Sequence, residues 1–168
     1  MTNVSYDDWK KLAPVLRDDD GSLPDLLEIE FASEEGVGRT LDYILPTLGP
    51  AAYECIAHVN GEGLDCPLRS IANLPERLWS GDVDAFIVWL SGLFDDEEEL
   101  EDWAAAYFWP SCLQIFVKPG VHWTHGRFVK FVRILTDLKD LAGGDVSGLK
   151  WDGYESVTEY LIAHLNGV

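Results

Sequence analysis

The period of the hydrophobic pattern changes along this chain, and that change constrains the fold more than any other sequence feature. Between Asp25 and Phe31 apolar and polar residues alternate, which indicates a half-exposed strand. Over residues 127–141 apolar residues recur every three or four positions, which indicates an amphipathic helix that the glycines at 143–144 end. A chain that carries both periods is predicted to pack helices against a sheet.

The same patterns and their flanking signals predict the other elements. Helices are expected over residues 7–17 after the cap Ser5, from Ser33 to about residue 48, and from about Asp152 onward. A short helical turn is expected at 75–80, and strands at 51–59, 68–71 and 113–117, with a helix as the alternative at 51–59. Residues 85–90 are continuously apolar, which favours a strand buried on both faces over a buried helix.

Length and composition favour one folded unit. The chain has 168 residues, 47% of them hydrophobic, which suits one filled core and is typical of globular proteins. No repeat, linker or low-complexity tail interrupts it. We therefore expect residues 1–168 to form a single globular domain of the α+β class, with a central, mostly antiparallel sheet flanked by helices.

The charge balance limits the classes of partner. Thirty acids and twelve bases give a formal net charge of −18. A field of that sign repels nucleic acids and anionic membrane surfaces, and it attracts basic proteins. Solubility alone is the alternative explanation of the acidity, because net charge also keeps proteins dispersed.

The cysteine pattern and the N-terminal residues indicate whether the chain holds a metal and in which compartment it is expected. Cys55, Cys66 and Cys112 are odd in number and widely spaced, with no C-x-x-C pair, so neither a disulfide framework nor a zinc site is predicted. The first residues are acidic and lack an apolar signal region, and no apolar run approaches the roughly 20 residues of a membrane span. We expect a cytoplasmic protein that holds no cofactor and binds neither membranes nor nucleic acid directly.

Acidic and aromatic residues concentrate in residues 78–117, a window that contains nine acids and no lysine or arginine. Adjacent like charges repel one another, so such a block usually faces solvent or a partner. The window is therefore predicted to be an interface for a basic surface, with a solvated loop as the alternative. The acids expected to steer the partner are Asp95, Asp96, Glu97, Glu98, Glu99, Glu101 and Asp102. The aromatic anchors are expected to be Trp103, Tyr107 and Trp109.

Signatures of catalysis are sparse. The sequence has no P-loop, no G-x-S-x-G elbow and no G-x-G-x-x-G between a strand and a helix. His122 and His125 could share a metal on a helix, but the preceding Pro-Gly pair at 119–120 favours a loop. We expect no enzyme and no metal site, with a small enzyme whose unrecognised site lies near His122 and His125 as an alternative.

The acidic, aromatic window at 78–117 and the acidic run at 18–20 give the chain a resemblance to a known class. It resembles the immunity proteins of bacterial toxin systems, which are small, acidic inhibitors. The resemblance is one of overall type, and it implies a cytoplasmic protein that binds and neutralises a cognate basic toxin, for example a nuclease. A nucleic-acid mimic that inhibits a defence or restriction protein is an alternative, which predicts two spaced rows of carboxylates. A structural domain of an assembly is another, which predicts a large exposed apolar patch.

Overall fold

The computed structural model describes residues 3–48, 55–90 and 104–168. The helices are α1 (Tyr6–Leu16), α2 (Glu34–Leu48), α4 (Leu74–Trp79), α5 (His125–Ala142) and α6 (Glu155–Leu165), with a 3-10 turn at Leu68–Ser70. The strands are β1 (Asp25–Phe31), β2 (Ile56–Val59), β3 (Leu64–Pro67), β4 (Phe86–Trp89), β5 (Ala104–Phe108), β6 (Cys112–Val117) and β7 (Gly143–Gly148).

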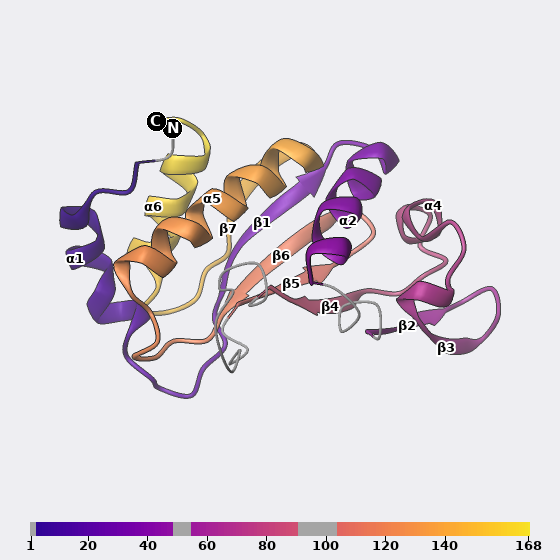
Figure 1. Ribbon diagram of the computed structural model, residues 1–168, viewed down its shortest axis with the longest axis horizontal. Helices are drawn as coiled ribbons and strands as arrows, with labels where there is room; N and C mark the ends of the chain where they lie inside the picture. The colour runs from indigo at the N-terminus through magenta and orange to yellow at the C-terminus, as the bar shows by residue number, and fades with distance from the viewer. Residues whose placement is uncertain (1–2, 49–54, 91–103) are drawn as a thin grey trace.

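Five strands form the main sheet, in the order β4-β5-β6-β1-β7, and every neighbouring pair is antiparallel. The antiparallel hairpin β2–β3 forms a second, smaller sheet. Figure 1 shows α1, α6 and α5 along one side of the main sheet, with the hairpin and α4 at one end of the molecule. The mixed α+β class and the antiparallel sheet are as the sequence predicts.

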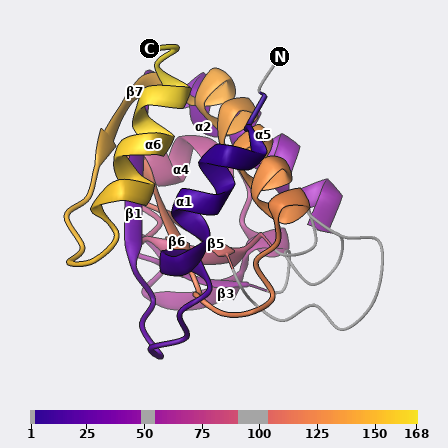
Figure 2. The ribbon, with the colours of Figure 1, turned by 90° about the vertical axis from the view of Figure 1, so that its left-hand side faces the viewer.

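Alternation along the strands sends one set of side chains into the helical layer. In β1 the side chains of Leu27, Ile29 and Phe31 are buried. They belong to one continuous core with the buried helix residues Phe131 of α5 and Leu161 of α6. Figure 2 shows α1, α6 and α5 gathered on the same side of the strands. The apolar faces that the two periodicities predict therefore meet in a single core.

Local signals in the sequence set the helix ends. The Ser5 hydroxyl accepts a hydrogen bond from the backbone N–H of Asp8 at 3.1 Å, which caps α1. The Thr124 hydroxyl accepts one from Arg127 N–H at 3.2 Å and caps α5. Gly143 ends α5 with a φ of 76°, a left-handed conformation that glycine adopts without strain. The predicted starts of α1 and α2 and the end of α5 are confirmed.

Trp123 anchors the loop before α5 into the core. Its side chain is fully buried, and its indole N–H donates to the carbonyl of Lys118 at 2.9 Å. Its ring meets Phe131 edge-on, with the ring centroids 5.3 Å apart. A buried indole with a satisfied N–H is a strong packing element, so this loop belongs to the core.

Three expectations about the elements are wrong. Residues 68–70 form a 3-10 turn, and the strand lies earlier, at Leu64–Pro67. The tight turn at residues 60–63 reverses the chain directly after β2, so the next residues pair with β2 as β3. The last helix begins at Glu155, because Gly153 has a φ of 90° and donates its N–H to the Glu155 carboxylate. The expected strand at 51–59 is confirmed at Ile56–Val59, while residues 51–54 lie outside the described part of the chain.

The third error concerns β4. The strand exists, but it is not buried on both faces: Ile87 and Trp89 are 42% and 38% exposed, while Phe86 and Val88 are buried. β4 is the outermost strand of the main sheet, and only its inner face meets the helical layer. Because β4 lies at the sheet edge with one face uncovered, two of its large side chains remain exposed to solvent.

Candidate protein-binding face

The main sheet has a second face, opposite the helical layer, which we call the open face. Paired residues on neighbouring strands point to the same side, so the register gives its rows. One row contains Glu28, Gln114, Tyr107 and Ile87 on β1, β6, β5 and β4. A parallel row contains Asp25, Phe116, Ala105 and Trp89 on the same strands.

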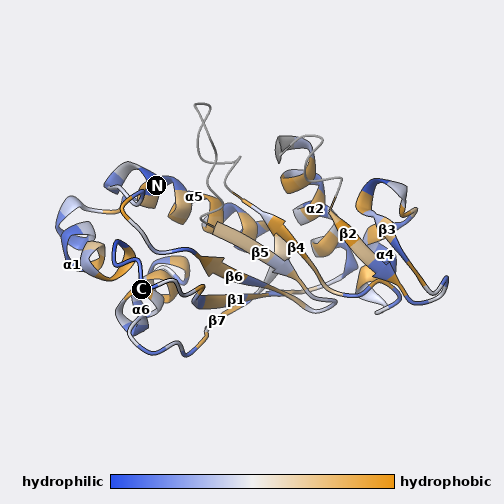
Figure 3. Ribbon diagram, turned by 90° about the horizontal axis from the view of Figure 1, so that it is seen from below, coloured by the Kyte–Doolittle hydropathy of each residue, from blue (hydrophilic) through white to orange (hydrophobic). Residues whose placement is uncertain are grey.

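Aromatic and aliphatic side chains occupy one half of this face, over β4, β5 and the adjoining part of β6. Trp109 is 40% exposed, and its ring centroid lies 5.0 Å from that of Tyr107. Tyr107 in turn lies 6.1 Å from Phe116. With Ile87 and Trp89 these rings form what we call the aromatic half, and Figure 3 shows β4 and β5 side by side in hydrophobic colours. Exposed aromatic rings are the side-chain type that most often anchors a protein partner.

Carboxylates occupy the other half of the face, which we call the acidic half. Asp25, Glu28 and Glu30 project from β1, because Leu27, Ile29 and Phe31 take the positions on the helical side. Glu28 accepts a hydrogen bond from the Gln114 side chain at 3.3 Å, which fixes its place beside the aromatic half. Glu30 is exposed.

Asp25 is the most constrained of these acids. A bulge in β1 between Asp25 and Leu27 places Asp25 opposite Phe116 and therefore on the open face. Its Oδ1 atom is buried and has no hydrogen-bond partner among the described residues. Burial raises the pKa of the Asp25 carboxyl, because a charge held away from water is penalised. Among the described residues no ion pair reaches this carboxylate.

The Cys112 thiol lies on the same face, next to the acidic half. Burial, together with the neighbouring carboxylate of Glu28, raises the pKa of Cys112 to about 11. The thiolate is the reactive form of cysteine, so this side chain is protonated and unreactive at neutral pH. The open face therefore offers contacts for a partner and no nucleophile.

The strands of the main sheet carry no basic side chain. None of the five strands β1, β4, β5, β6 and β7 contains a lysine or arginine. Ion pairs within residues 3–48, 55–90 and 104–168 use other carboxylates, on helices and at the small hairpin. Basic residues lie on the helices, for example Lys10 on α1 and Lys130 on α5, and in the segments that follow β6 and β7, where Lys118 and Lys150 lie. Among the residues of the described strands, the open face therefore carries only acidic charge on one half and is apolar on the other.

The residues predicted for partner binding divide into two groups. Tyr107 and Trp109 lie together on the aromatic half. Trp103 and the seven acids from Asp95 to Asp102 lie outside the described residues. In the sequence, residues 91–103 stand between β4 and β5.

Sequence reasoning missed most of the open face. Ile87 and Trp89 were expected to be buried, and the acids of β1 were expected only to face away from the core. Alternation in β1 carried the signal for Glu28 and Glu30. No pattern along the chain could have placed them near Trp89, because that depends on the strand order.

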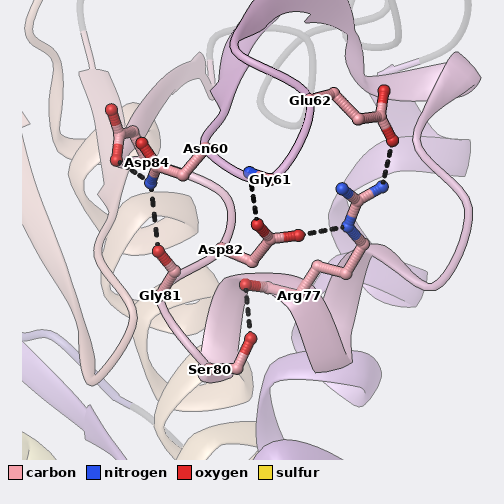
Figure 4. Close-up of polar contacts among 8 residues, drawn as sticks. All are labelled: Asn60, Gly61, Glu62, Arg77, Ser80, Gly81, Asp82 and Asp84. Carbon is pink, nitrogen blue, oxygen red and sulfur yellow. Dashed lines mark hydrogen bonds and ion pairs between the residues drawn. The ribbon is translucent and has the colours of Figure 1, made fainter.

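A second group of charged side chains is structural. Arg77 donates to the Asp82 carboxylate at 2.7 Å and to Glu62 at 3.1 Å, and Asp82 also accepts from the N–H of Gly61 at 2.7 Å (Figure 4). The hydrogen bonds with Arg77 and Gly61 lower the pKa of Asp82. Asn60 adds a bond to Asp84 at 2.7 Å (Figure 4). These contacts tie the β2–β3 hairpin to the segment between α4 and β4.

The two histidines near residue 122 contact backbone carbonyls. His122 Nε2 lies 2.9 Å from the oxygen of Lys118, and His125 Nε2 lies 3.2 Å from the oxygen of Val4. A carbonyl oxygen only accepts, so in each ring Nε2 carries the proton. His125 also meets the Tyr6 ring edge-on at 5.3 Å. Both rings hold the loop and the N-terminal segment in place.

A hollow of about 530 Å³ lies beside α1, between Tyr6, Trp9, Lys10 and Arg17. The residues that line it include no carboxylate, imidazole or thiol. The lining is instead basic and aromatic, and the Lys10 ammonium lies 4.8 Å from the centroid of the Tyr6 ring.

Within the described residues no group of three or more His, Cys, Asp or Glu side chains is arranged to hold a metal ion. Over the same residues, no helix has both the length and the apolar character needed to cross a bilayer. Comparisons of the chain with protein-family models, with curated proteins and with solved structures find no match.

Proposed function

We propose that this protein is a non-enzymatic inhibitor of the immunity type, which binds and neutralises a basic protein toxin through the open face of its main sheet. One observation carries the proposal: exposed aromatic side chains lie beside uncompensated carboxylates on a sheet face whose strands contain no basic residue. We place this activity in the cytoplasm of the cell that needs protection.

The two halves of the face supply what such an inhibitor requires. A net charge of −18 speeds the encounter with a basic protein and orients it before contact. Tryptophan and tyrosine are the residue types that most often dominate the binding free energy once contact is made. Charge gives rate and selectivity, while the rings give a long-lived complex.

The arrangement of the acids favours a protein partner over imitation of a nucleic acid. A mimic should present two spaced rows of carboxylates. The acidic half instead draws Asp25, Glu28 and Glu30 from the single strand β1, and the neighbouring half of the face is aromatic. A basic toxin domain with an apolar contact patch fits this combination better, and a nuclease is one such domain.

The test is co-expression with the product of the adjacent reading frame. Rescue of growth from a toxic neighbour, together with co-purification of the two proteins, is the expected result. The complex should then resist high salt only in part, because the charged contacts are screened while the aromatic contacts persist. A harmless neighbour that does not co-purify would remove the main support for the proposal.

Two double variants separate the open face from total charge. Glu28→Gln with Glu30→Gln removes two charges from the face, and Asp42→Asn with Glu159→Gln removes two exposed charges from helices α2 and α6. Only the first pair should slow association and reduce protection. Equal effects from both pairs would show that the open face is not the contact surface.

A further inference from the structure

The spacing and chemistry of the open face define which kind of partner surface it accepts. Neighbouring strands lie about 4.8 Å apart, so side chains two strands apart are separated by about 10 Å. Glu28 on β1 and Tyr107 on β5 belong to one row and are two strands apart. In the next row Asp25 is the direct neighbour of Phe116.

Asp25 is the residue of this face whose carboxylate lacks a hydrogen-bond partner at one oxygen. Most buried polar atoms have a hydrogen-bond partner, so a buried carboxylate oxygen without one calls for a reason. Asp25 Oδ1 is such an atom, and no ion pair within the described residues reaches this side chain. Oδ1 itself is covered, but Asp25 as a residue is only partly buried, so a partner on the open face can bring a positive charge beside this carboxylate.

We infer that the open face receives a partner segment that carries an arginine or lysine about 10 Å from an apolar side chain. The cation is bound by Asp25 and Glu28, and the apolar side chain lies against Trp89, Tyr107 and Phe116. The inference rests on the proposed function, and it adds to it the chemistry of the partner and a central role for Asp25.

Complementary charge is the argument for this occupant. A second copy of the chain would bring another −18 toward the same face, and its own strands would supply no cation to Asp25. A segment with a basic and an apolar side chain is complementary to both the acidic half and the aromatic half. Arginine is the better match of the two bases, since its guanidinium can donate two hydrogen bonds to a carboxylate and stack on a neighbouring ring such as Phe116.

A peptide pair tests the inference without the natural partner. The first probe is the blocked heptapeptide Arg-Gly-Gly-Trp-Gly-Gly-Arg, whose flexible glycine pairs let an arginine and the ring reach the same face about 10 Å apart. The second probe has glycine in place of tryptophan and the same charge. Binding is followed by amide chemical shifts in two-dimensional NMR, which give both the dissociation constant and the location.

The tryptophan peptide should bind at least threefold more tightly than the glycine peptide, and its largest shifts should fall on β1, β4, β5 and β6. Asp25→Asn should weaken its binding about three- to tenfold, because asparagine keeps an acceptor oxygen but loses the charge that strengthens the hydrogen bond. The control Asp42→Asn removes the same charge from an exposed position of α2 and should change binding less than twofold.

Three results would each overturn the inference: equal affinity of the two peptides, largest shifts on the helices α1, α5 and α6, or equal effects of the two Asp→Asn variants. These outcomes do not depend on the co-expression test. A toxin that co-purifies but is insensitive to Asp25→Asn would leave the immunity role standing and remove this contact. If the peptide maps to the open face but the adjacent gene product is not toxic, the binding surface is supported and the immunity role is not.

Discussion

Gly36 and Gly38 lie two residues apart in α2, and the structure assigns them opposite responses to alanine. A Cβ atom on Gly36 would lie 2.4 Å from the carbonyl oxygen of Ala142, at the end of α5. That oxygen also accepts the N–H of Ala32 at 3.0 Å, so it cannot move without disturbing the junction of β1 and α5. A Cβ atom on Gly38 would meet only the Pro75 ring, at an ordinary 3.7 Å.

The magnitudes follow from these contacts. Alanine gains up to about 1 kcal/mol over glycine inside a helix, so Gly38→Ala should raise the free energy of unfolding by roughly 0.5–1 kcal/mol. Gly36→Ala has the same gain but adds an overpacking cost of about 3 kcal/mol, because a backbone carbonyl cannot rotate away. We expect a net loss of about 2 kcal/mol, which lowers Tm by about 4–8 °C in a chain of this size.

Urea unfolding and differential scanning calorimetry of the two variants and the parent protein measure both changes. The matched pair removes helix propensity as an explanation, since both substitutions are Gly→Ala in the same helix. A Gly36→Ala protein as stable as the parent would refute the close approach of α2 to the end of α5. Loss of stability in Gly38→Ala would show that α2 faces its neighbours differently.

Three further predictions concern the carboxylates and the exposed rings. Burial raises the pKa of Asp25, so its charge opposes folding once ionised: Asp25→Asn should be more stable than the parent at neutral pH, and the difference should vanish below about pH 4, where unfolded aspartate is protonated. The pKa of Asp82 is lowered by Arg77, so the sign reverses: Asp82→Asn should be less stable at neutral pH, and denaturation curves should converge as the parent's carboxylate is protonated in acid. Trp109→Ala removes a ring that is 40% exposed, so it should cost about 1–2 kcal/mol of folding stability but about 2–4 kcal/mol of partner binding, and a loss of stability of about 3 kcal/mol or more would mark Trp109 as core instead.

The acidic window shows how sequence and structure divide the candidate site. The sequence identified Tyr107 and Trp109 as neighbours of a charge block, because both features are local in the chain. It did not predict β5, because an Ala-Ala-Ala-Tyr-Phe segment has little strand preference of its own. Pairing with β4 and β6 on its two sides makes it a strand and turns Tyr107 to the open face.

Local patterns determined the helices α1, α2 and α5 and the strand β1, because a cap, a glycine stop and a hydrophobic period act within a few residues. Only the tertiary structure decided that Gly143–Gly148 would be a strand: its glycines favour no strand, and Gly144 lies too close to the Glu30 carbonyl for any side chain. The tertiary structure likewise placed Asp25 opposite Phe116 and left Ile87 and Trp89 in solvent. Strand order and the choice of covered face depend on contacts between residues far apart in sequence, and no local period records them.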